Sequence, residues 1–137
     1  MVRPAWLLGL VLLALPACTR PITPEQASAR LVGIWQHVRQ NGQPVPPRTD
    51  VSGLMEIEPG GVLKREAPVE VYAAGVLQSR NVQKVEDRFR FLDGETMEVT
   101  GNDRGQVRTW RVRAVLAGTR LTLHKPDGVV DDYDRIK

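Results

Sequence analysis

Beyond residue 30 the chain is a series of short runs in which apolar and polar residues alternate, with glycine or proline between the runs. Alternation with a period of two is typical of strands that bury one face, and closely spaced turn residues are typical of antiparallel sheets. The pattern predicts an all-β antiparallel domain. We expect strands near residues 31–38, 51–58, 62–66, 69–78, 84–91, 95–100, 106–116, 119–125 and 129–136.

Four glycine-containing turns, at 59–61, 92–94, 117–118 and 126–128, predict how neighbouring strands pair. A slip of one residue would turn every side chain of a strand to the other face. We therefore chose for each turn the loop length that places apolar residues on one face and charged residues on the other. The resulting apolar pairs are Ile57 with Leu63, Phe89 with Met97, Val112 with Leu123, Ala114 with Leu121, and Leu121 with Tyr133.

About eight or nine consecutive short strands joined by tight turns favour a small up-and-down barrel over a sandwich, because closure removes the exposed edges of a meander. The segment 67–83 alternates weakly, so its strand layout stays open. The prolines within 41–50 predict an open loop, because proline cannot donate to a ladder. We expect the interior to hold Leu31, Trp35, Met55, Ile57, Leu63, Phe89, Met97, Val99, Trp110, Val112, Ala114, Leu121, Leu123 and Tyr133.

The N-terminal segment has a different pattern. Arg3 precedes an apolar run from Ala5 to Ala17, and the only cysteine of the chain, Cys18, follows it. The run is too short to cross a bilayer, which takes a helix of about 20 apolar residues. A basic residue, a short apolar stretch and a small residue at the end predict an export signal that is removed. We assign residues 1–17 to this signal.

Residues 18–28 form a tether ahead of the barrel domain, which we place at 29–137. Within the tether, Thr23 followed by Pro24 and Gln26 is typical of a capped helix start. We expect one or two helical turns there, before the first strand.

The 19 basic and 16 acidic residues are interleaved and form no basic stripe, so nucleic acid is not an expected partner. No nucleophile, metalloprotease or phosphate-loop motif occurs, and no cofactor or enzymatic activity is expected. Of the two histidines, alternation turns His37 toward the Trp35 face and His124 outward. It also turns Asp132 and Asp134 outward and Asp131 inward, so these three acids are not expected to share a metal ion.

Leu15-Pro16-Ala17-Cys18 resembles the lipobox of bacterial lipoproteins. The resemblance implies that Cys18 becomes the new N-terminus and carries acyl chains such as palmitate. Two or more chains anchor a protein firmly in a membrane. The implied location is the cell envelope. In a host with two membranes it is the outer membrane facing the periplasm, since Thr19 rather than aspartate follows the cysteine.

Gly33-Ile34-Trp35 on the first strand and Tyr133-Asp134-Arg135 on the last resemble the small bacterial lipocalin-like proteins of the calycin group. The resemblance implies a barrel closed at one end by Trp35. It also implies that Arg135 packs across the indole and donates hydrogen bonds to the backbone of the first strand. Gly33, Trp35 and Arg135 are thus the expected barrel-closing residues.

The barrel predicts two functions. The first is binding of a small apolar or amphiphilic ligand in the barrel mouth. The alternative is a filled barrel that acts as a structural lipoprotein or binds an envelope protein. The residues expected to line a ligand cavity are His37, Met55, Ile57, Phe89, Met97, Trp110, Val112, Leu123 and Tyr133.

Overall fold

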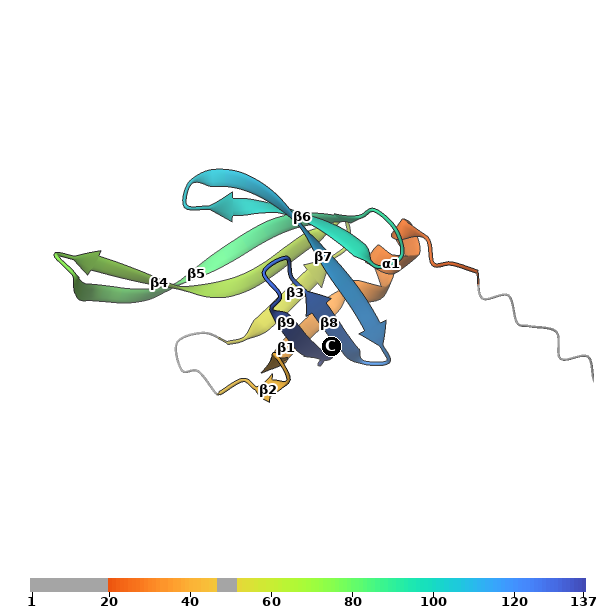
Figure 1. The fold of residues 1–137 in the computed structure, drawn as a ribbon, viewed down its shortest axis with the longest axis horizontal. Coiled ribbons are helices and arrows are strands. Elements are labelled where there is room, and N and C mark those ends of the chain that lie inside the picture. Colours follow the sequence, from red (N-terminus) through yellow and green to blue (C-terminus); the bar gives the residue numbers. More distant parts are fainter. Residues whose placement is uncertain (1–19, 47–51) are drawn as a thin grey trace, which may run out of the picture.

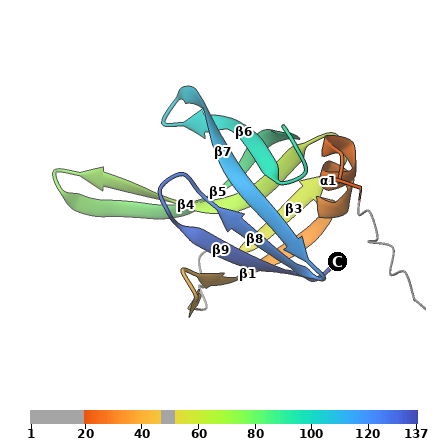
Figure 2. The same ribbon diagram turned by 45° about the vertical axis from the view of Figure 1, so that its right-hand side comes forward.

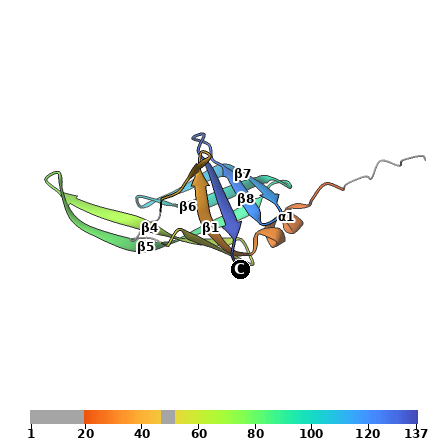
Figure 3. The same ribbon diagram turned by 90° about the horizontal axis from the view of Figure 1, so that it is seen from below.

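The computed structural model describes residues 20–46 and 52–137 and confirms the all-β prediction (Figure 1). Eight antiparallel strands follow one another around a closed barrel, and the last pairs with the first. Figure 3 shows these two strands side by side. The barrel strands are β1 (Gly33–Gln40), β3 (Leu54–Glu58), β4 (Val62–Ala73), β5 (Val76–Phe91), β6 (Thr96–Asp103), β7 (Gln106–Ala117), β8 (Arg120–His124) and β9 (Val130–Arg135).

A short extra strand, β2 (Gln43–Pro44), pairs with the end of β1. The predicted open loop at 41–50 is therefore wrong at its start, where Asn41 and Gly42 adopt positive φ and turn the chain back on itself. Pro44 is tolerated because β2 is an edge strand with only one neighbour. The rest of the predicted loop, residues 47–50, lies outside the described residues.

Two of the four predicted registers are confirmed: Ile57 lies opposite Leu63, and Leu121 lies opposite Tyr133. The other two are wrong by two residues, which leaves every side chain on its predicted face. Around 92–94 the structure pairs Phe91 with Met97, because the Asp93 carboxylate accepts hydrogen bonds from two backbone amides and stabilises a longer loop.

The turn between β7 and β8 differs for a simpler reason. Its two loop residues are Gly118 and Thr119, because Ala117 pairs with Arg120. Leu123 consequently lies opposite Ala114, and not opposite Val112 as predicted.

The strand predicted at 69–78 is wrong, because the chain reverses within it. Ala74 and Gly75, with φ of 51° and 76°, form the turn of one long hairpin between β4 and β5. Positive φ at both central residues is typical of the turn that suits a twisted two-residue hairpin. The far part of this hairpin extends beyond the barrel as a two-stranded arm (Figures 1 and 3).

The predicted capped helix is confirmed as α1 (Pro24–Leu31). The Thr23 hydroxyl accepts from the Gln26 amide at 3.2 Å, and the Gln26 side chain accepts from the Thr23 amide at 3.0 Å. The helix continues to Leu31, so the first strand begins at Gly33 rather than at the predicted residue 31. Figure 2 shows α1 at one end of the barrel. No helix among the described residues is long and apolar enough to cross a membrane.

The interior is a packed apolar core, and most residues of the predicted interior are buried in it. Trp110 and Tyr133 are only partly buried and pack against it. The prediction missed Ala27, whose helix covers the barrel end, as well as Val62 and Phe91. The buried apolar residues are Ala27, Leu31, Trp35, Met55, Ile57, Val62, Leu63, Phe89, Phe91, Met97, Val99, Val112, Ala114, Leu121 and Leu123.

Candidate functional site

The end of the barrel beneath α1 is closed by Trp35, which is fully buried. Its indole N–H donates to the carbonyl of Leu31 at 2.8 Å, and the Arg135 guanidinium carbon lies 4.4 Å from the centre of its ring. A guanidinium over an indole is worth about 0.5–2 kcal/mol, more where water is excluded. The two side chains lie on paired positions of β1 and β9, the first and last barrel strands. Their contact therefore stabilises the pairing that closes the barrel.

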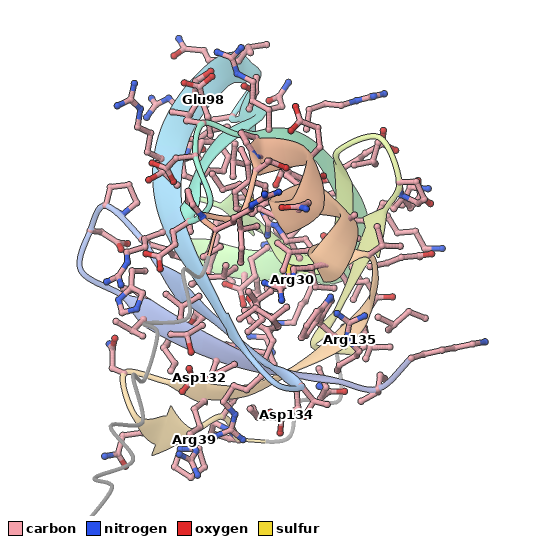
Figure 4. All side chains as sticks on the ribbon, turned by 90° about the vertical axis from the view of Figure 1, so that its right-hand side faces the viewer. Arg30, Arg39, Glu98, Asp132, Asp134 and Arg135 are labelled. Atoms are coloured by element: carbon pink, nitrogen blue, oxygen red, sulfur yellow. The ribbon has the colours of Figure 1, made fainter. Side chains whose placement is uncertain are left out.

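Arg135 also donates to two backbone carbonyls, from Nη1 to Val32 at 2.8 Å and from Nη2 to Arg30 at 2.5 Å. Both acceptors lie just ahead of β1 and not within it, so the guanidinium ties α1 to the barrel. Figure 4 shows Arg135 close to Arg30. A side chain at Gly33 would overlap the carbonyl of Lys137, which explains why only glycine fits beside this contact.

The opposite end of the barrel is open and contains a cavity of about 930 Å³. Its walls differ in character. The segment around β2 and the start of β3 contributes apolar groups such as Val45 and Leu54, whereas polar and charged groups come from β1, β4, β9 and Lys125, which follows β8. The polar lining residues are Gln36, His37, Gln40, Gln43, Ser52, Arg65, Glu66, Lys125, Asp131 and Tyr133.

A buried carboxylate organises the polar wall. Asp131 is 1% exposed. Its carboxylate accepts hydrogen bonds from Lys125 Nζ at 2.5 Å and from the Gln40 side-chain amide (Nε2) at 3.1 Å. The Nε2 atom of His37 lies 3.0 Å from the same carboxylate. Burial disfavours the charge on Asp131, but the hydrogen bonds from Lys125 and Gln40 outweigh it. The pKa of this carboxyl is therefore held below its ordinary value of 3.8.

An irregularity in β1 allows two of these groups to meet. His37 lies opposite Tyr133 and Gln40 lies opposite Asp131, with a register shift between His37 and Arg39. Without that shift, residues 37 and 40 would point to opposite faces of the strand, because their separation is odd. The extra residue of the bulge turns both side chains toward the cavity.

Tyr133 forms the next layer of this wall. Its ring stacks on His37, with centroids 4.9 Å apart and planes inclined by 26°. Burial and the nearby charge of Asp131 raise the pKa of its hydroxyl, while Arg65 opposes the rise. The phenol is consequently neutral and can act as a hydrogen-bond donor toward the cavity.

A second buried acid lies near the cavity. Asp87 is 3% exposed, and its carboxylate lies 3.6 Å from Nε of Arg65, which lines the cavity. A Cβ at Gly101 would overlap this carboxylate and the ring of Trp110, so the absence of a side chain there leaves room for Asp87. The polar groups near the open end thus include two acid–base pairs, Asp131 with Lys125 and Asp87 with Arg65.

Asp132 and Asp134 are paired with Thr122 and Arg120 of β8 and lie on the outward face, as alternation predicts. Asp132 accepts from the Thr122 hydroxyl at 2.7 Å, and Asp134 accepts two hydrogen bonds from Arg120. Across residues 20–46 and 52–137, no group of three or more histidine, cysteine, aspartate or glutamate side chains could hold a metal ion.

Of the residues expected to line a ligand cavity, only His37, Met55 and Tyr133 do so. The others do not line it, because their side chains are buried in the packed core or, for Trp110, packed against it. These residues are Ile57, Phe89, Met97, Trp110, Val112 and Leu123. Sequence reasoning missed Gln40, Lys125 and Arg65 as cavity residues. Cys18 lies outside the described residues.

No protein-family model matches this sequence, and no curated protein matches it either. The class of the protein is therefore set by the structure: a small closed antiparallel barrel with a helix at its filled end and a polar-lined cavity at its open end. This arrangement is consistent with a lipocalin-like fold. It is compatible with ligand binding or with a structural role.

Proposed function

We propose that this chain is a membrane-anchored envelope lipoprotein whose lipocalin-like barrel binds a small amphiphilic molecule at its open end. The cavity is the observation that carries the proposal. Its volume of about 930 Å³ is within the range of small-molecule sites, about 300–1,000 Å³. The filled interior beneath it excludes a ligand from the closed half.

The two unlike walls of the cavity favour an amphiphile over a purely apolar ligand. Leu54 and Met55 offer apolar contact on one side, and Lys125 and Tyr133 offer donors on the other. A hydrocarbon alone would offer no acceptor to the Tyr133 hydroxyl or to the N–H groups of Lys125 that do not bind Asp131, and it would lose affinity, since unpaired buried polar groups cost about 1–3 kcal/mol each. A ligand with a polar head and a short apolar part would satisfy both walls.

The lipocalin-like assignment is supported by the closing residues. Trp35 and Arg135 make the contact that the resemblance implies, and they do so across the seam between the first and last strands. The alternative role, a structural or protein-binding barrel without a ligand, is favoured by the apolar core of buried side chains inside the barrel. Direct binding measurements separate the two.

Filling the cavity should weaken ligand binding. We expect the Gln43→Trp variant of the domain from residue 19 onward to bind a dansylated fatty acid at least about ten-fold more weakly than the parent domain. Gln43 lines the cavity from β2, and the indole would occupy part of the cavity volume. Titration by dansyl fluorescence measures the affinity.

The matched control is Gln106→Trp, which makes the same substitution on an exposed residue at the start of β7, away from the cavity lining. It should leave the affinity unchanged. If the parent domain binds neither this probe nor a panel of other amphiphiles, the structural role becomes the better proposal.

Anchoring through Cys18 is supported by the lipobox-like segment at residues 15–18. We expect the Cys18→Ala chain, expressed in bacteria that are fed a clickable palmitate analogue, to lose all incorporation of the analogue. Thr19→Ala should keep it, because that position is not acylated. Incorporation that persists in Cys18→Ala would contradict the anchor and, with it, the location in the cell envelope.

A further inference from the structure

The far end of the hairpin between β4 and β5 is apolar and carries no charge. Residues 71–79, which we call the hairpin tip, contain no acidic or basic side chain. Val71, Tyr72, Val76 and Leu77 are each between 43% and 61% exposed. Figures 1 and 3 show the tip extending well away from the barrel. Large apolar side chains gathered at one exposed place are typical of a contact site.

The apolar side chains lie on both faces of the ribbon. Tyr72 is paired with Leu77, and its hydroxyl donates to Glu70 at 2.7 Å, which places this pair on the face of Glu70. Val71 is paired with Ser79 and alternates with Tyr72, so it lies on the other face, as Val76 does. A protein surface that covered one face would leave the other in water. A medium that encloses the tip covers both.

Two charged side chains lie next to the tip, on the side toward the barrel. Arg80 and Glu70 face each other across the ribbon, with Nη2 of the arginine 2.6 Å from Oε1 of the glutamate. The Tyr72 hydroxyl reaches down to the same glutamate. An aromatic ring with an apolar body and a polar end is enriched at the level of lipid headgroups.

We propose that the hairpin tip inserts into the interfacial layer of a lipid bilayer, with the pair of Glu70 and Arg80 at the water boundary. From Ala74 to Arg80 the strand covers about six residues, or about 20 Å at full extension, and an oblique approach would bury its apolar part by about 5–10 Å. Deeper insertion is opposed because the outer edges of the two strands carry unpaired backbone groups, which hydrocarbon does not tolerate.

The tip lies at the opposite end of the molecule from α1 (Figures 1 and 3). A chain anchored through its N-terminus therefore brings the tip to the same bilayer only when its long axis lies along the membrane surface. The insertion itself rests on the tip residues and does not require the anchor.

A dye at the tip tests the proposal. The full chain carrying Cys18→Ala and Val76→Cys has a single thiol, which can be labelled with an environment-sensitive nitrobenzoxadiazole dye. With vesicles of phosphatidylethanolamine and phosphatidylglycerol, we expect the emission to shift to the blue. We also expect quenching by lipids that carry a nitroxide in the acyl chain. Leu77→Glu in the same chain should weaken this response at least about ten-fold, because a charge is strongly disfavoured in the apolar layer.

The matched control carries the dye at Val107→Cys, which replaces a residue 76% exposed on β7, next to Arg108. Its emission should stay that of a dye in water, which would show that the apolar N-terminal segment alone does not account for the response. An unchanged emission at position 76, or an equal response at positions 76 and 107, would overturn the proposal. The first of these results would indicate that the tip contacts a protein partner instead of a bilayer.

Discussion

Replacing Trp35 with alanine is expected to lower the free energy of unfolding by about 3–5 kcal/mol, the usual cost of removing a large buried aromatic side chain. The loss has three sources. The indole fills the closed end of the barrel, its N–H bonds to Leu31, and its ring supports the Arg135 guanidinium. Urea denaturation followed by circular dichroism measures the change.

Trp110→Ala is the matched control, because Trp110 is only partly buried and should cost clearly less. A double-mutant cycle with Arg135→Met isolates the contact between indole and guanidinium, for which we expect a coupling of about 0.5–2 kcal/mol. A loss from Trp35→Ala no larger than that from Trp110→Ala would show that Trp35 does not hold the barrel end closed.

Replacing Asp131 with asparagine should destabilise the domain by about 1–3 kcal/mol at neutral pH, less than the 3–5 kcal/mol for a fully buried pair because Lys125 is partly exposed. The effect should depend on pH in a defined direction. The folded pKa of Asp131 lies below the ordinary value of 3.8, so its contribution is complete above that value and is lost as the pH falls through the folded pKa.

The difference in unfolding free energy between parent and Asp131→Asn should therefore shrink as the pH falls below about 3.8. Denaturation curves at several pH values measure it. Asp132→Asn is the control, since Asp132 faces outward and binds only the Thr122 hydroxyl among the contacts described for it. A difference for Asp131→Asn that does not change with pH would contradict the role given to its charge.

Alternation predicted the barrel because nearly every barrel strand buries one face, and glycine marked most of the turns. The two incorrect registers, at 92–94 and 117–118, share a cause: a shift of two residues preserves the faces, so alternation cannot detect it. The long hairpin escaped prediction for a different reason. Beyond the barrel both of its faces meet solvent, and no buried face imposes a period of two.

The polar site was predictable only in part. Alternation placed His37 and Asp131 inward, but nothing in the sequence marks the bulge that also turns Gln40 inward. Lys125 reaches Asp131 from beyond the end of β8, where no strand pattern applies. The depth of the cavity also depends on how side chains fill the closed half, which pattern alone does not give.

Because β1 pairs with β9, the barrel cannot close before its last strand is present. The Arg135 hydrogen bond to Val32 joins residues 103 positions apart, and the strands between them each pair with a sequence neighbour. A nascent chain can thus form its local hairpins early, but closure must wait until synthesis has passed β9. Contacts of such long sequence separation are slow to form. A chain that stopped short of β9 would therefore form its local hairpins but would leave β1 without the strand that closes the barrel.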